Sequence, residues 1–138
     1  MSQQVNMETQ EKFGAAVNDG NLSEIMQLMS PGVVDHDPAP TQGSGPEGFI
    51  AFFTEFRQGF PDLKIDVEHA VADENNISIA YTVTGTHRGV FMGIPPTGRK
   101  ISARGVQIAR FVDGKIVERW GSSDQLGILQ QLGADVVA

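Results

Sequence analysis

The hydrophobic repeat of this 138-residue chain changes once, near residue 63, and this change limits the folds that the chain can adopt. Before residue 63 apolar residues recur every three or four positions, whereas after it they alternate with polar residues. Side chains share a face at a period of 3.6 in a helix and at a period of two in a strand. The order therefore predicts one α+β domain over 1–138, with helices first and antiparallel strands after them.

The segment 43–63 is the clearest predicted helix. Its apolar stripe consists of five aromatic residues at helical spacing, Phe49, Phe52, Phe53, Phe56 and Phe60. The spacing favours a helix that packs on a sheet, and an aromatic ligand box is the alternative. Other helices are predicted over 5–18, 21–29 and just after Asp124, and strands over 63–71, 77–84, 101–112 and 115–122.

The dipeptide Asp113-Gly114 predicts a two-residue type I′ turn between the last two strands. With that turn, Gln107 is expected opposite Trp120, and both side chains should line the interior. The same face carries three small residues, Ala103, Gly105 and Ala109. Small residues in mid-strand leave volume that either a bound molecule or the phenylalanine-rich helix must fill.

The opposite face of the same hairpin is aliphatic at its centre and cationic at its rim. Val106, Ile108 and Val117 form the apolar centre in this register. Such a face is typical of a symmetric contact between two copies of a chain. We therefore expect a homodimer.

Composition narrows the classes of partner. A formal net charge of −7 argues against nucleic-acid binding, and no 18-residue apolar run is present to span a membrane. The absence of cysteine rules out disulfides and thiolate chemistry. The first residues lack the basic and apolar regions of a secretion signal, so a cytoplasmic location is expected.

Several motifs together resemble one family. The longest are G-x-x-x-G-I-P-P-T-G-R at 89–99, R-F-x-D-G-K-I-x-E-x-W at 110–120 and D-x-x-x-x-L-x-Q-L-G at 124–133. Shorter matches are VDHDP at 34–38, GPEGF at 45–49 and FPDL at 60–63. Through these motifs nearly the whole chain resembles the SnoaL-like polyketide cyclases, also called ester cyclases.

The resemblance implies a fold, an activity and site residues. The implied fold is the cone of ketosteroid isomerase, in which helices close a curved antiparallel sheet around a deep apolar cavity. The implied activity is ring closure of a polyketide methyl ester by intramolecular aldol condensation, without metal or cofactor. The family's general acid/base aspartate corresponds to Asp124 and a strand glutamine to Gln107, whereas a cyclase histidine corresponds to Ala109. His36 corresponds to a polar residue of the early extended segment.

Asp124 has two interpretations on the residues alone. Ser122 and Gln125 have the spacing of a capping box, and a carboxylate in the first turn of a helix is stabilised by its dipole. Alternatively, the carboxylate lies at the mouth of an apolar cavity and takes a proton from a carbon next to a carbonyl.

His87 and His36 each have a structural and a functional interpretation. His87 continues the apolar phase of the strand 77–84, so it is either a hydrogen-bonded core residue or a catalytic one. His36 lies between Asp35 and Asp37, in a turn or near the site. Three adjacent residues do not converge on one ion, so no metal site is expected.

A small hydrophobic molecule is the expected ligand. The side chains expected to contact it are Trp120, Phe53, Phe56, Tyr81, Phe91, Met92 and Phe111. Phe91 and Met92 belong to a loop rich in glycine and proline, which either forms a lid or tucks under the sheet.

Three functions stay open at this point. The chain is an acid/base enzyme acting on a small hydrophobic carbonyl compound, a non-catalytic module that binds a hydrophobic ligand, or a partner-binding domain with a filled interior. A hollow interior reached by titratable groups would distinguish the first from the others.

Overall fold

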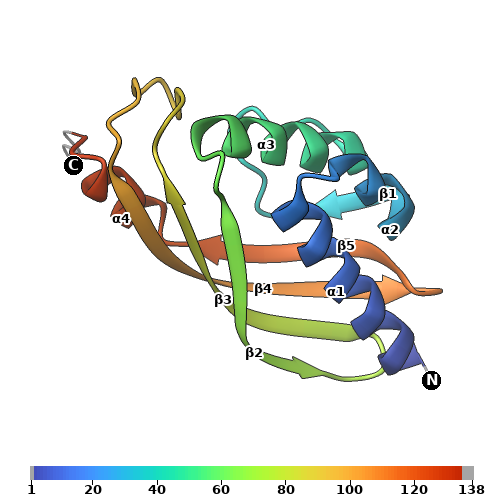
Figure 1. The fold of residues 1–138 in the computed structure, drawn as a ribbon. Helices are drawn as coiled ribbons and strands as arrows, with labels where there is room; N and C mark the ends of the chain where they lie inside the picture. Colours follow the sequence, from blue (N-terminus) through green and yellow to red (C-terminus); the bar gives the residue numbers. More distant parts are fainter. Residues whose placement is uncertain (1, 135–138) are drawn as a thin grey trace.

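The computed structural model describes residues 2–134 (Figure 1). The helical elements are α1 (Ser2–Asp19), the 3-10 turn η1 (Leu22–Glu24), α2 (Ile25–Leu28), α3 (Gly45–Gly59) and α4 (Gln125–Gln131). The strands are β1 (Met29–Asp35), β2 (Lys64–Ala72), β3 (Asn76–Thr86), β4 (Lys100–Val112) and β5 (Lys115–Ser123). Within residues 2–134 no helix is both long enough and apolar enough to cross a membrane.

The strands form a five-stranded sheet in the order β1-β5-β4-β3-β2. Figure 1 shows that the sheet is curved and open, with α1 and α3 lying over the same face. The predicted α+β class is confirmed, with helices leading and strands following. The edge strand β1 was not predicted as part of the sheet, and it pairs with β5 in parallel, not antiparallel.

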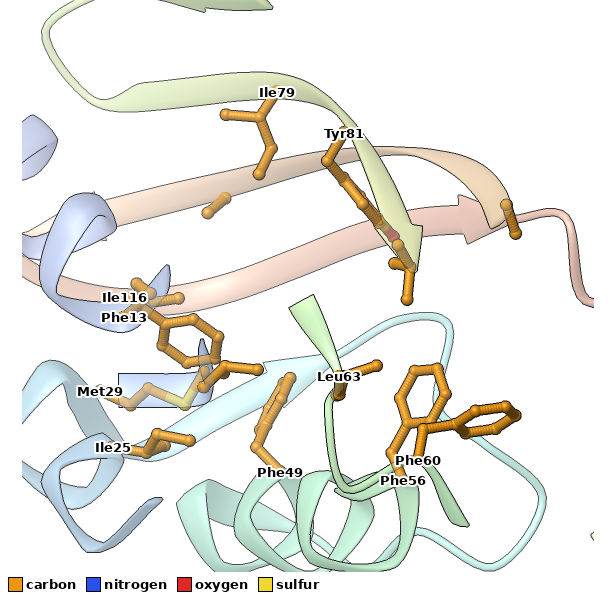
Figure 2. Packing of buried hydrophobic residues seen from close by; sticks show 14 of the residues in the cluster. Phe13, Ile25, Met29, Phe49, Phe56, Phe60, Leu63, Ile79, Tyr81 and Ile116 are labelled. Carbon is orange, nitrogen blue, oxygen red and sulfur yellow. The ribbon is translucent and has the colours of Figure 1, made fainter. Parts of the chain in front are cut away.

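The aromatic stripe of α3 faces the sheet. Phe49, Phe56 and Phe60 are buried, and Phe52 and Phe53 are partly buried against the same core. Figure 2 shows Phe49, Phe56 and Phe60 on the helix side, with Ile79 and Tyr81 reaching toward them from the sheet. The stripe therefore faces the sheet, as its period predicts.

The turn between β4 and β5 forms as predicted. Asp113 and Gly114 have φ angles of 51° and 75°, the left-handed values that a type I′ turn requires. Val112 pairs with Lys115 across the turn. The predicted register therefore holds for the first residues of the hairpin.

A β-bulge then shifts the register of β5 by one residue. Phe111 pairs with Ile116, but the preceding residue Arg110 pairs with Glu118, which leaves Val117 as the extra residue. Because strand side chains alternate between faces, a shift of one residue moves every later β5 side chain to the other face.

The predicted pairing of Gln107 with Trp120 is therefore wrong. Gln107 pairs with Gly121 on the inner face, whereas Trp120 pairs with Ile108 on the outer face. Arg119, which a hairpin without the bulge would place on the outer face, lies opposite the buried Ala109 and points inward.

The outer face carries a stacked and charged cluster. The ring of Trp120 stacks on that of His36, with centroids 4.6 Å apart and planes 9° apart. Glu118 lies 2.8 Å from His36 Nε2 and also accepts a hydrogen bond from Arg110. The bonds from His36 and Arg110 hold the pKa of Glu118 below its usual value. Exposed apolar side chains lie beside this cluster, namely Val34, Val106, Ile108 and Val112.

We propose that this outer face pairs two copies of the chain. Its charges are compensated within one copy, so two such faces can meet without like charges being left opposed. Ultracentrifugation should show a dimer at micromolar concentration, and Ile108→Lys should give a folded monomer because Ile108 is exposed. Trp120, the only tryptophan, should shift its emission on dissociation. A wild-type monomer at micromolar concentration would contradict the proposal.

Candidate functional site

The space between the sheet and the helices α1 and α3 holds a cavity of about 340 Å³. This volume lies within the range of small-molecule sites. Its walls are mostly apolar and include Phe13, Val17, Phe49, Phe52, Phe53, Phe56, Ile65, Ile79, Val83, Phe91, Ile116 and Ile128. The interior is thus hollow, which argues against a partner-binding domain with a filled interior.

One wall of the cavity is polar and centres on Arg119. Its Nη1 donates to Asp35 Oδ1 at 3.1 Å, and its Nε donates to Gln107 Oε1 at 3.1 Å. The side chains of Arg119 and Asp35 are 18% and 6% exposed. Because this pair is largely removed from water, it fixes the guanidinium and the Gln107 amide at one place on the wall.

Asp35 also fixes the loop at the cavity mouth. Its Oδ1 accepts from the backbone N–H of Asp37, and its Oδ2 accepts from Gln42 Nε2 at 2.9 Å. Asp37 in turn accepts from the backbone N–H of Gly121 at 2.9 Å. Asp35, Asp37, Gln42 and Gly121 all line the cavity, so this network forms its rim.

Tyr81 reaches the same cavity from β3. Burial raises the pKa of its phenol, and the charge and hydrogen bond of Arg119 act in the opposite direction to a smaller extent. The phenol therefore stays protonated at neutral pH and can donate a hydrogen bond to an oxygen in the cavity.

Gly105 makes room for the Tyr81 ring. The two residues pair across β3 and β4, and a Cβ at Gly105 would lie only 2.4 Å from the Tyr81 ring. The volume left by this glycine is thus filled by tyrosine, not by a ligand. Any larger residue at position 105 would displace the phenol from the polar wall.

Known proteins are similar to this chain in both sequence and fold. The family model of SnoaL-like polyketide cyclases matches residues 8–132. The chain is 30% identical over 125 residues to the aklanonic acid methyl ester cyclase DnrD of Streptomyces peucetius, covering 86% of this chain and 83% of the relative. It is also 30% identical to the nogalonic acid methyl ester cyclase of Streptomyces nogalater, with 86% and 90% covered. The structure of TsrD from Streptomyces laurentii matches with a TM-score of 0.87 at 27% identity, covering 96% and 97%.

This chain belongs to the SnoaL-like polyketide cyclase family. The resemblance carried by the sequence motifs is thereby confirmed, and the matched region includes α3, all five strands and α4. The relatives matched at 30% identity are named as cyclases, which supports an enzymatic role for this SnoaL-like domain.

Several predicted residues of the SnoaL-like domain do meet in the cavity. Phe53, Phe56, Tyr81, Phe91 and Gln107 all line it. Phe91 lies in the glycine-rich loop and packs inward, its ring 5.4 Å from that of Phe56. This part of the loop tucks under the sheet and closes one side of the cavity.

Met92 and Phe111 do not line the cavity. Met92 follows Phe91 with a positive φ of 49°, and its side chain is exposed. Its sulfur lies 3.1 Å from Gln125 Nε2, so the loop contacts the start of α4 beside the mouth. Phe111 is fully packed in the core near the β4–β5 turn.

His36 and Trp120 lie on the outer face, away from the cavity that they were expected to line. The bulge at Val117 explains the position of Trp120, because every β5 side chain after the bulge points to the opposite face of the sheet. His36 follows the last residue of β1, whose Asp35 points inward, so the next side chain points outward.

His87 is a buried core residue and does not line the cavity. Its Nδ1 accepts from the backbone N–H of Thr97 at 3.2 Å and lies 3.0 Å from the Thr97 hydroxyl. Its ring also packs against Phe60, with centroids 5.4 Å apart. These contacts hold the two ends of the glycine-rich loop together, which gives His87 a structural role.

Asp124 caps α4. Its Oδ1 accepts a hydrogen bond from the backbone N–H of Gly127 at 2.9 Å, and its side chain is exposed. The predicted box of Ser122 and Gln125 does not form, because Asp124 itself is the N-cap residue. The expected apolar surroundings are absent, but Ser123 and Gln125 on either side line the cavity. Asp124 therefore lies at the mouth and not in the interior.

Arg119 and Asp35 were missed as site residues. The assumed register placed Arg119 on the outer face, and a bulge has no reliable sequence signal. The sequence did hold one clue to the register. A regular hairpin puts Glu118 on the inner face and a bulged one puts Arg119 there, so either register buries one charged residue that needs a partner. An acidic residue in the VDHDP segment offered a partner for the arginine only.

A first prediction concerns the Tyr81 phenol. Tyr81 is the only tyrosine, so phenolate absorbance reports it alone, and the midpoint should lie above the usual value of about 10. The folded state favours the neutral phenol, so its contribution to stability is complete below about pH 10 and is lost as pH rises through the folded pKa. Tyr81→Phe should remove the absorbance change. A midpoint at or below about 10 would contradict this assignment.

A second prediction concerns the pair of Arg119 and Asp35. Arg119→Met should lower the free energy of unfolding by about 3 kcal/mol, because it leaves the carboxylate buried without its partner. Adding Asp35→Asn to that variant should recover part of the loss. Urea unfolding of the four proteins in a double-mutant cycle measures the coupling. A double variant destabilised by the sum of the two single losses would show that the pair is not coupled.

Proposed function

We propose that this protein closes a ring in a small hydrophobic carbonyl compound by an intramolecular aldol reaction that uses acid/base chemistry without a cofactor. The observation that carries the proposal is the meeting of Tyr81, Arg119 and Gln107 on one wall of a mostly apolar cavity. Hydrogen-bond donors in a dry cavity favour an oxygen that gains negative charge during a reaction. The names of the relatives, which are methyl ester cyclases, support the same class of chemistry.

The polar wall supplies the oxygen site. Removal of a proton from the carbon next to a carbonyl gives an enolate, whose oxygen Tyr81 and Arg119 would stabilise. The enolate carbon then attacks a second carbonyl carbon of the same molecule, forming the ring bond and an alkoxide. The alkoxide takes up the proton, so that the reaction needs no other reactant.

Asp124 is proposed as the base that removes and returns this proton. One carboxylate oxygen accepts the capping bond from Gly127, while Oδ2 has no hydrogen-bond partner among residues 2–134. Both neighbours in sequence, Ser123 and Gln125, line the cavity. A substrate that enters past these residues covers the carboxylate and removes water from it, which strengthens its pull on the proton.

Asp37 is another carboxylate at the mouth, and unlike Asp35 it is not paired with the Arg119 guanidinium. It lines the cavity, but its Oδ2 accepts the backbone N–H of Gly121 at 2.9 Å, so it also holds the rim. This makes Asp37 a suitable matched control for Asp124, because both are acidic residues at the rim that each accept one backbone hydrogen bond.

The test uses aklanonic acid methyl ester and nogalonic acid methyl ester as probes. Asp124→Asn should lower kcat for ring closure by about 10²-fold or more, the usual contribution of a general base. Its stability should change little, since asparagine caps a helix about as well as aspartate. Asp37→Asn should retain most of the activity.

Two outcomes would count against the proposal. Loss of activity in Asp37→Asn alone would move the base from Asp124 to Asp37. Tight binding of both esters by the wild type without any ring closure would instead support a module that only binds hydrophobic ligands.

A further inference from the structure

Gln10 is a polar side chain of the cavity wall whose Oε1 has no hydrogen-bond partner among residues 2–134. It lies on α1, is 7% exposed and lines the cavity. Its Oε1 is buried and accepts no hydrogen bond from the residues that the structure describes. A buried amide oxygen without a donor is unfavourable, so its presence needs a reason.

The other buried polar residues of α1 do have partners. Asn6 donates through Nδ2 to the Glu74 carbonyl at 2.9 Å, and the Thr9 hydroxyl donates to the Gly114 carbonyl at 2.6 Å. These two bonds attach α1 to the turns at one end of the sheet. Gln10 adds no such attachment, so anchoring α1 does not explain its position.

Gly14 lies one helical turn after Gln10 and also lines the cavity. A Cβ built at Gly14 would meet no atom within 4 Å. Glycine inside a helix lowers helix stability, and here no close packing requires it. Residues four apart share a helix face, so this glycine leaves open space beside the Gln10 amide.

We propose that Gln10 and Gly14 form the inner end of the ligand site, where Gln10 Oε1 accepts a hydrogen bond from a hydroxyl group of the ligand. The open space at Gly14 admits the ring that carries this hydroxyl. The hydrogen bond from Thr9 to Gly114 places the inner end of the cavity beside the β4–β5 turn. Arg119 lies five residues after Gly114, further along β5. The ligand's hydroxyl and its reacting carbonyl therefore bind at separate places. The inference rests on the proposed function only in taking the cavity as the ligand site.

Two probes of nearly equal shape test the hydroxyl requirement. 2-Naphthol can donate a hydrogen bond and 2-methoxynaphthalene cannot. Calorimetric titration of the wild type should give about tenfold tighter binding of 2-naphthol. In Gln10→Leu this preference should fall to nearly one, because the acceptor is lost, with little change for 2-methoxynaphthalene. Gln107→Leu, which alters an amide on a different wall of the cavity, should keep the preference.

Gly14→Leu tests the open space independently. Leucine would fill the space beside Gln10, so both probes should bind at least tenfold more weakly. The melting temperature should not fall, because leucine favours a helix more than glycine does. This variant therefore separates loss of the subsite from loss of the fold.

Three results would overturn the proposal: a preference for 2-naphthol that persists in Gln10→Leu, its loss in Gln107→Leu instead, or no binding of 2-naphthol to the wild type. None of these measurements involves ring closure. Failure of the two methyl esters to react would count against the proposed function and leave the subsite standing.

Discussion

The contact between Arg119 and Asp35 joins two strands of the sheet that lie more than 80 residues apart in sequence. Asp35 ends the parallel edge strand β1, and Arg119 lies on β5, which belongs to the antiparallel meander. The pair holds the Gln107 amide on one side and the rim loop through Gln42 on the other. Separating the two charges would leave a buried carboxylate without compensation, so β1, β5 and the rim depend on each other.

This contact exists because of the bulge at Val117. A regular hairpin would turn Arg119 outward and bring Glu118 and Trp120 into the cavity. With the bulge, the inner face receives a cation that matches Asp35, and the outer face receives Glu118 beside Arg110 and His36. One extra residue thus places both groups of charges opposite suitable partners. Bulges commonly re-aim side chains next to functional sites, and this one defines the polar wall.

Hydrophobic period and turn chemistry are local signals, and they predicted the parts of this fold that local rules decide. The helix α3, the strands β2 to β5 and the turn at Asp113-Gly114 are all where the sequence placed them. The parallel pairing of β1 could not be predicted in this way, because it depends on contacts with a strand more than 80 residues away. The same limit applies to the site. Tyr81 on β3 and Gln107 on β4 line the cavity as predicted, because the bulge does not affect their strands. Trp120 follows the bulge on β5, so its predicted position was wrong.

The polar groups of the cavity are few, and their separation decides how a ligand must lie. Tyr81, Arg119 and Gln107 share one wall, Asp37 lies at the rim, Asp124 is exposed between two lining residues, and the remaining lining is largely aromatic and aliphatic. An apolar molecule gains from burial anywhere along this lining, so burial alone does not orient it. Orientation has to come from the polar positions, since a misplaced ligand oxygen would lose its bond to water without replacing it. In the mechanism proposed above, residues of α1 would select which molecule fits, while residues of β5 and the mouth would carry out the reaction. The two proposed tasks would then lie on different elements of the fold, so a substitution in α1 should alter ligand choice without altering the groups that react.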